Sequence, residues 1–213
     1  MDGIVLFNGK VGYRFFPKVA CTSIKRELYR LKTGIEYDPK NHNSKFVHDY
    51  MYNHTRSMDN CEFRFMVFRD PIERFLSAYS NRVVHYGELS KSFIQKKHPE
   101  LISEIEVFDP TLPQFIENLD TYLKVRTIKH HTAPMVSFMN KEGLEVFNHI
   151  YSIKELSMLE RDLSDYLKKS VKFGRSQTGG PKLKLSDLDC THIEFLHNFY
   201  MEDYALLNEY IKR

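Results

Sequence analysis

The chain has 213 residues and a formal net charge of +3 with both signs well mixed, which suits a single globular domain and argues against nucleic-acid binding. Hydrophobic residues make up 42% of the chain, enough for one sizeable core, and phenylalanine and tyrosine supply much of its volume because tryptophan is absent. The cysteines Cys21, Cys61 and Cys190 lie far apart, so they form neither a metal-binding spacing nor a disulfide framework. A reducing compartment is therefore expected.

The chain carries no targeting or membrane signal that we recognise. Its N-terminus has no basic leader, and no window reaches eighteen apolar residues. We therefore expect a cytoplasmic protein with no transmembrane segment, no bound metal and no nucleic-acid partner. We expect one domain over residues 1–213, with variable, loop-rich excursions at about 35–60 and 88–109, where polar and charged residues lack clean periodicity.

The first element is a predicted β-hairpin over residues 4–16, which turns at the Asn8-Gly9 pair. Its second strand, Val11–Phe16, is apolar and aromatic, and Pro17 ends it because proline has no N–H to donate. Helical spacing then begins at Ser23 and reaches a natural end at glycine 34. The order strand, tight loop, helix points several backbone N–H groups at one spot, with the positive end of the helix dipole behind them.

The loop between this strand and helix has the side chains of an anion site. Lys18 supplies a cation, and Thr22 and Ser23 supply hydroxyl groups, which together suit a phosphate or a sulfate. The loop is not a Walker A motif, because it has no glycine and its lysine stands four residues before Thr22. The alternative is an ordinary strand–helix turn with a surface lysine.

A second strand–helix junction follows the predicted strand Glu62–Phe68. Asp70 stands at the N-cap position, with proline 71 first in the helix and Glu73 third, which is the pattern of a helix start. Arg69 leaves the end of the strand, and Ser77 lies on the exposed side of the helix. A guanidinium and a hydroxyl in this arrangement can hold a second phosphate. The alternative is that Arg69 pairs with a surface carboxylate and Ser77 is solvated.

The remaining elements alternate between helices and short strands. We predict a short element near 46–52, a helix after 111–114, a loop over 126–140, strands at 146–151 and 171–173, a helix after 152–155, a loop at 174–181 and a last helix from Thr191 to about Ile211. This alternation favours an α/β fold with a central parallel sheet flanked by helices. In such sheets ligands bind beyond the carboxyl ends of the strands, where both junctions lie.

The sequences PKVACTS at 17–23 and VFRDPIERFLSAY at 67–79 resemble two motifs of the sulfotransferases that use 3′-phosphoadenosine 5′-phosphosulfate (PAPS). The chain is most similar to carbohydrate O-sulfotransferases of the heparan sulfate 2-O, chondroitin and HNK-1 type, as a cytoplasmic, bacterial member. The resemblance implies a P-loop NTPase-like three-layer fold. It also implies transfer of the sulfuryl group from PAPS to an acceptor hydroxyl on a carbohydrate or glycolipid, with 3′-phosphoadenosine 5′-phosphate (PAP) as product and no metal.

The resemblance assigns roles to residues at both motifs. The first motif implies a 5′-phosphosulfate-binding loop made of Pro17, Lys18, Val19, Ala20, Cys21, Thr22 and Ser23. The second implies a 3′-phosphate site with Arg69 and Ser77. Arg175 lies in a loop, 174–181, that corresponds to the segment closing over the nucleotide. Lys18 would stabilise the charge that builds on the leaving phosphate, because sulfuryl transfer depends on positioning and charge stabilisation.

An acceptor hydroxyl also needs a base, and histidine is the usual choice near neutral pH. The chain has ten histidines. In the 2-O-sulfotransferase-like relatives a catalytic histidine precedes the second motif by about the interval that separates His48 from Arg69. We therefore predict His48 as the base, with His54 and His131 as the next candidates. The alternative is that His48 only hydrogen-bonds a loop.

Two other functions fit parts of the pattern. A P-loop kinase or phosphotransferase would use the same strand–loop–helix arrangement, but it needs the Walker A glycines that this loop lacks. A non-catalytic nucleotide-binding module on the same fold would keep the anion sites without the base.

Overall fold

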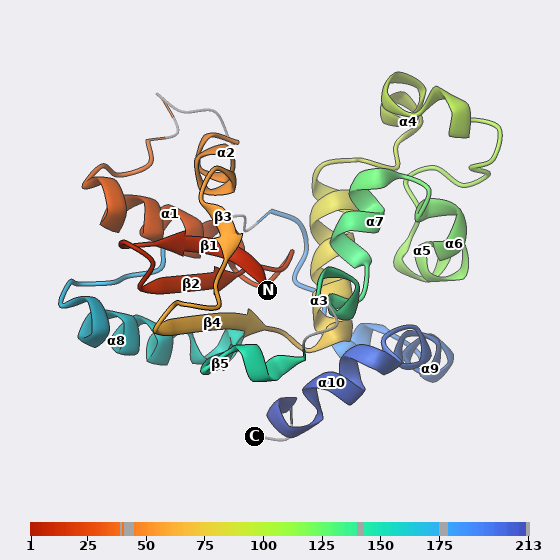
Figure 1. Cartoon of the computed structure of the whole chain (residues 1–213). Coiled ribbons are helices and arrows are strands. Elements are labelled where there is room, and N and C mark those ends of the chain that lie inside the picture. Colours follow the sequence, from red (N-terminus) through yellow and green to blue (C-terminus); the bar gives the residue numbers. More distant parts are fainter. Residues whose placement is uncertain (39, 41–44, 140–142, 175–178, 212–213) are drawn as a thin grey trace. The chain divides into compact units, whose positions relative to one another are not determined.

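The structure is a computed structural model, and it describes residues 1–38, 40, 45–139, 143–174 and 179–211 (Figure 1). The chain divides into two compact units. The sheet unit comprises Met1–Arg69, Phe138–Gln177 and Tyr210–Arg213, and the helical unit comprises Asp70–Ser137 and Thr178–Glu209. Both units are discontinuous in sequence, since the chain passes from the sheet unit to the helical unit and back twice.

The sheet unit carries the five strands. Its elements are β1 (Asp2–Leu6), β2 (Val11–Arg14), α1 (Cys21–Thr33), α2 (Phe46–Tyr52), β3 (Thr55–Ser57), β4 (Phe63–Phe68), η4 (Leu144–Val146), β5 (His149–Ser152), η5 (Ile153–Glu155) and α8 (Leu156–Leu167). The strands lie in the order β3-β1-β2-β4-β5. Strands β2, β4 and β5 are parallel, whereas β1 is antiparallel to both β2 and β3.

The predicted α/β class is therefore confirmed, but the prediction of a purely parallel sheet is wrong. The reason is the hairpin at the start of the chain. Phe7, Asn8 and Gly9 all have positive φ, at 54°, 58° and 86°, and they make the tight turn that the Asn-Gly pair predicts. A turn of this length can join only antiparallel strands, so β1 pairs with β2 in that direction and the sheet is mixed.

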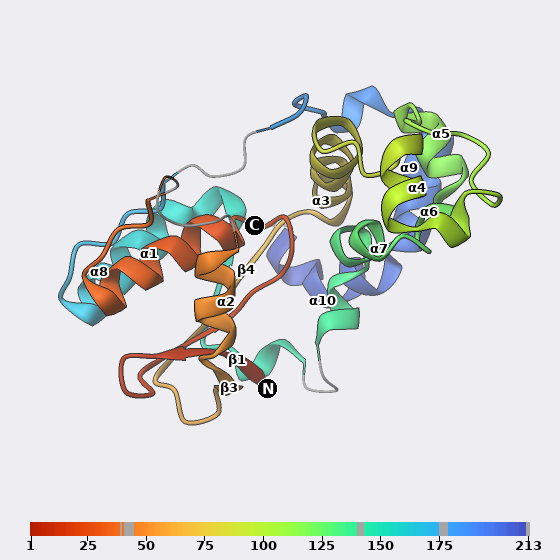
Figure 2. The same ribbon diagram turned by 90° about the horizontal axis from the view of Figure 1, so that it is seen from above.

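The face of the sheet that carries Tyr13 is rich in aromatic rings. The register aligns Tyr13 with Phe65, and their rings stack with centroids 4.6 Å apart. Tyr166 of α8 packs on Phe63, two residues along the same strand, with centroids 5.2 Å apart. Helix α1 runs beside α8, because the Arg30 guanidinium of α1 donates to the carbonyl of Ser170 just after α8 (Figure 2).

The helical unit consists of helices and connecting segments. Its elements are α3 (Pro71–Ala78), the π-helix η1 (Tyr79–His85), α4 (Lys91–Lys97), η2 (Pro99–Leu101), α5 (Leu112–Glu117), α6 (Leu119–Tyr122), α7 (Arg126–Thr132), η3 (Met135–Phe138), η6 (Leu185–Asp187), α9 (Cys190–Phe199) and α10 (Met201–Ile211), with η3 and α10 each ending in the sheet unit. Its core contains a run of aromatic rings in which Phe115 packs between Phe75 and Tyr122.

Helix starts agree well with the sequence predictions. The Asp70 carboxylate accepts a hydrogen bond from the N–H of Glu73 at 3.0 Å, and proline 71 opens α3. Capping boxes are present at Thr111 with Gln114 and at Ser152 with Glu155. The short element predicted at 46–52 is helix α2.

Other local elements differ from the predictions. The segment 88–109, expected to be a loop-rich excursion, contains α4 and η2 with buried apolar side chains. The segment 126–140 opens with α7 instead of forming a loop. The third strand is shorter and later than predicted, at β5, and no strand forms at 171–173. The last predicted helix is two helices, α9 and α10, which meet at Tyr200.

Candidate functional site

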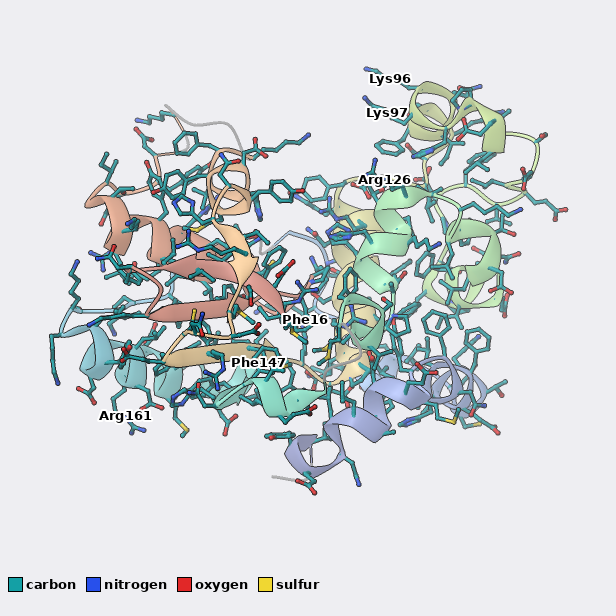
Figure 3. The ribbon with its side chains drawn as sticks, in the orientation of Figure 1. Phe16, Lys96, Lys97, Arg126, Phe147 and Arg161 are labelled. Atoms are coloured by element: carbon teal, nitrogen blue, oxygen red, sulfur yellow. The ribbon has the colours of Figure 1, made fainter. Side chains whose placement is uncertain are left out.

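The loop that follows β2 has an unusual backbone. Phe16, labelled in Figure 3, is fully buried and marks the point at which the loop begins. Lys18 and Ala20 then have φ values of 67° and 61°, in the left-handed region that residues with a side chain seldom adopt. Val19, between them, is fully buried and anchors the loop to the core of the sheet unit. Strain of this kind persists where the surroundings impose it, and it concentrates at functional sites.

Helix α1 starts directly from this loop without a side-chain cap. Ala20 is the N-cap residue and has no side-chain oxygen to accept a hydrogen bond. The first helical bond runs from the N–H of Ile24 to the carbonyl of Ala20, at 3.1 Å. The N–H groups of Cys21, Thr22 and Ser23 come before that bond and have no acceptor within the helix. The first turn carries no acidic residue, so these N–H groups and the helix dipole favour an anion.

Helix α2 brings His48 to the same place. Its Nε2 atom lies 3.5 Å from the hydroxyl oxygen of Thr22, and its Nδ1 atom lies 3.4 Å from Nζ of Lys25. The predicted base therefore lies beside a residue of the predicted phosphosulfate loop. The two are 26 residues apart in sequence, and the packing of α2 on α1 brings them together.

Lys25 is the one residue of this cluster that the sequence analysis missed. Only 4% of its surface is exposed, and its Nζ atom lies 3.3 Å from the centroid of the Phe15 ring. Burial lowers the pKa of Lys25 to about 8, and the nearby Cys21 thiol opposes that shift. Lys25 stands three residues after Thr22, on the same face of the helix. That spacing was a signal that could have identified it.

The other two histidine candidates already have structural partners. Nδ1 of His54, which follows the end of α2, lies 2.9 Å from the carbonyl oxygen of Tyr50 in that helix. His131, in the helical unit, contacts the carbonyl of Thr127 through Nδ1 at 2.8 Å and the guanidinium of Arg82 through Nε2 at 2.7 Å. Both nitrogens of His131 are therefore engaged, which argues against its use as a base.

The second motif divides into two groups of residues. Arg69 and Ser77 are both half-buried, Arg69 directly after β4 and Ser77 in α3 of the helical unit. Arg74 is fully buried, and the hydroxyl of Tyr79 donates to the carbonyl of Pro110 at 2.9 Å. Arg74 and Tyr79 therefore stabilise the helical unit, although they match the motif as well as Arg69 and Ser77 do.

The terminal nitrogens of the buried Arg74 guanidinium face polar groups of the helical unit. The guanidinium donates to the carbonyls of His131 and Ala133, at 3.3 and 2.6 Å, and lies 3.8 Å from the buried carboxylate of Asp203 in α10. Asp203 in turn accepts hydrogen bonds from the N–H groups of residues 135 and 136. Burial raises the pKa of Asp203 despite these bonds and the charge of Arg74.

One predicted site residue, Arg175, lies outside the residues that the structure describes. Among the described residues, no group of three or more histidine, cysteine, aspartate or glutamate side chains is placed to hold a metal ion. Over the same residues, no helix combines the length and apolar character that crossing a membrane requires.

The structure is that of an α/β protein in which a helix without a side-chain cap starts from the loop that follows a parallel strand. A model described as the sulfotransferase family matches residues 8–210, so the match extends over both units. The chain therefore belongs to the sulfotransferase family and is a sulfotransferase enzyme, as the two motifs predict. No curated protein and no solved structure gives a significant match to the chain.

Proposed function

We propose that this sulfotransferase uses PAPS as its donor and transfers the sulfuryl group to a hydroxyl of a carbohydrate or glycolipid acceptor. The single observation that carries the proposal is the contact between His48 and Thr22, which joins a candidate base to a candidate anion loop at 3.5 Å. The carbohydrate class of acceptor comes from the resemblance of the two motifs to the heparan sulfate 2-O, chondroitin and HNK-1 type enzymes.

The loop at 17–23 fits a 5′-phosphosulfate group. Three backbone N–H groups without helical acceptors precede Ile24, the first turn of α1 carries no carboxylate, and Lys18 lies in the loop itself. In the proposal, Pro17 and Val19 fix the loop, its N–H groups hold the anion, and Lys18 supplies the cation. The donor, when bound, supplies an activated sulfuryl group on a phosphate leaving group.

The resemblance assigns the 3′-phosphate of the donor to Arg69 and Ser77, and the closing loop to Arg175. The resemblance alone supports these three assignments. Because one family match covers residues 8–210, we treat the chain as one sulfotransferase domain with a P-loop NTPase-like sheet at its centre. The parallel arrangement of β2, β4 and β5, with the loop after β2, supports that view of the fold. We propose that no metal is required.

The chain's own residues have two tasks in the transfer. Lys18 and the loop N–H groups stabilise the negative charge that develops on the departing phosphate oxygen. His48 takes the proton of the acceptor hydroxyl as that oxygen bonds to sulfur, which is the work of a general base. The proton is accepted at a lone pair of the imidazole, so the nitrogen that faces the acceptor must be unprotonated when the step begins.

The test is transfer of labelled sulfate from PAPS to a panel of acceptors. We expect label on one class of carbohydrate or glycolipid hydroxyl, and transfer about 1000-fold slower with His48→Ala. Calorimetry with PAP and with ATP–Mg²⁺ distinguishes the kinase alternative, because a sulfotransferase should bind PAP tightly without metal. Tight binding of ATP only with Mg²⁺, together with transfer of phosphate and none of sulfate, would contradict the proposal.

A further inference from the structure

The imidazole of His48 contacts α1 through both of its nitrogens. Nε2 lies 3.5 Å from the Thr22 hydroxyl and Nδ1 lies 3.4 Å from Nζ of Lys25. Thr22 and Lys25 are three residues apart in α1, so one face of the helix presents a hydroxyl and an amine to the same ring. The position of the proton on the ring is therefore linked to the charge of Lys25.

The chemistry of the two nitrogens makes this linkage specific. A protonated Lys25 has three donors and no acceptor, so it can only donate to a lone pair on Nδ1. The proton of a neutral imidazole must then lie on Nε2, which leaves no lone pair on the Thr22 side of the ring. A neutral Lys25 has one lone pair. It can accept from an N–H at Nδ1, and Nε2 then carries the unprotonated lone pair of the ring.

We propose that Lys25 is a positioning residue that determines which nitrogen of His48 carries the proton, so that only the form with neutral Lys25 presents Nε2 as a base. The proposal rests on the proposed role of His48 as the base. In the transfer step, the acceptor hydroxyl gives its proton to Nε2 while the acceptor oxygen bonds to sulfur and the bond from sulfur to the donor phosphate breaks. Throughout this step Lys25 stays on Nδ1 and keeps the ring in position.

The groups that face Lys25 set the pH at which its charge changes. Cys21 faces it from α1, His48 from α2, and the ring of Phe15 from the segment after β2. The face of the Phe15 ring favours the ammonium form, whereas burial disfavours it, and the pKa of Lys25 is lowered to about 8. A bound anionic donor would favour the ammonium form again. The change should therefore come at higher pH in the donor complex than in the free enzyme.

The first test observes the proton directly and does not depend on activity. Ring ¹⁵N shifts of His48, assigned by comparison with His48→Gln, are followed by NMR through a pH titration of the whole protein. We expect the neutral ring to carry its proton on Nε2 below about pH 8 and on Nδ1 above it. In Lys25→Met this change of tautomer should be absent. A tautomer that does not change in the wild-type protein overturns the proposal.

The second test compares the activities of Lys25→Arg and Lys25→Met. The proposal predicts that the arginine variant is the less active of the two, whereas a role in binding the anionic donor predicts the reverse. Lys25→Arg keeps a permanent positive charge beside Nδ1 of His48, so we expect kcat/KM to fall about 100-fold or more. Lys25→Met removes that charge, so the proton can lie on either nitrogen of the ring. We therefore expect kcat/KM to fall by no more than about tenfold and the pH–rate profile to show no change near pH 8. The matched controls are the same two replacements at Lys32, which is exposed on α1, with normal rates expected.

Other results identify other roles. Activity that survives in Lys25→Arg and is lost in Lys25→Met means that Lys25 binds the anionic donor, which overturns the proposal. Equal losses with an unchanged pH profile mean a structural role and also overturn it. If His48→Ala retains the wild-type rate, the proposed base is wrong. The NMR titration then still reports whether Lys25 controls the ring, so the two failures can be told apart.

Discussion

Two neighbouring parallel strands, β2 and β4, each lead into a helix, and the two helices start in opposite ways. Helix α1 starts from Ala20, in a left-handed conformation and with no side-chain cap. Helix α3 starts from Asp70, whose carboxylate accepts from the N–H of Glu73 and also from the hydroxyl of Tyr204 at 3.2 Å. Proline 71 removes a further N–H from the start of α3. The first junction leaves backbone donors for a ligand, whereas the second uses them itself.

This difference determines what each junction can do with an anion. In the proposed function, the backbone at α1 binds the phosphosulfate and Lys18 adds charge. At α3 the carboxylate of Asp70 accepts from the N–H of Glu73 and would repel an anion, so in the proposal the second phosphate is held by side chains such as Arg69. The proposal therefore assigns a backbone site to one strand–helix junction and a side-chain site to the other.

The largest effect is expected at His48, the proposed base on α2. His48→Ala should lower kcat about 1000-fold, within the range that a general base contributes, and should change the pH dependence of the rate. Initial rates of sulfate transfer across neutral pH measure this. His54→Ala is the matched control, because that ring is bound to the Tyr50 carbonyl. An unchanged rate with an unchanged pH profile would exclude His48.

The next effect concerns the cation of the first junction. Lys18→Ala should lower sulfate transfer by about 100-fold, the usual consequence of losing one electrostatic donor to a developing negative charge. Turnover at saturating donor measures it, and Lys32→Ala, at the exposed end of α1, is the control. Near-normal turnover in Lys18→Ala would show that the backbone donors suffice and that the lysine has no part in the transfer.

A smaller effect is expected from the left-handed residue at the start of α1. Ala20→Val places a β-branched side chain at φ 61°, which should lower the free energy of unfolding by about 2 kcal/mol and weaken binding of PAP. Ala20→Gly is the control, since glycine adopts this conformation freely and should bind as well as the wild type. Denaturant unfolding and calorimetry measure the two quantities. Equal PAP binding by the valine variant would mean that the loop does not need this conformation.

The smallest effect is expected at the capped junction. Asp70→Ala should lower the free energy of unfolding by about 1 kcal/mol, because the N–H of Glu73 loses its acceptor. Asp70→Asn should retain most of that stability, since asparagine caps helices about as well as aspartate. Urea unfolding of both variants makes the measurement. If the asparagine variant is as unstable as the alanine variant, the charge of Asp70, and not its cap, stabilises the start of α3.

The sequence predicts those parts of the fold that depend on neighbouring residues. The caps at Asp70, Thr111 and Ser152 and the turn at Asn8–Gly9 follow from local hydrogen bonding and backbone preference, and all are present. The Asn8-Gly9 turn predicts an antiparallel hairpin, whereas the alternation of strands and helices along the chain predicts a parallel sheet. The parallel prediction is wrong because it did not take the hairpin into account. At 126–140, two histidines and a proline suggested a loop where α7 forms.

The sequence predicts less of what depends on distant packing. Lys25 is buried because α2 and the Phe15 ring cover it, and nothing in its immediate neighbours indicates this. Arg74 has the positive charge that binding a phosphate requires, and it matches a phosphate-binding motif. Its partners, however, are residues 131, 133 and 203 of the chain itself. Motif position alone could not separate it from Arg69.

The contact between Arg74 and Asp203 also bears on the order in which parts of the chain fold during translation. Asp203 belongs to α10, the last helix of the described residues, while Arg74 is near the start of the helical unit. A buried guanidinium without its carboxylate is strongly unfavourable, so α3 should stay solvated and open on the ribosome until α10 emerges. Nascent chains arrested before residue 203 should therefore remain sensitive to protease around α3, and release of the full chain should protect it.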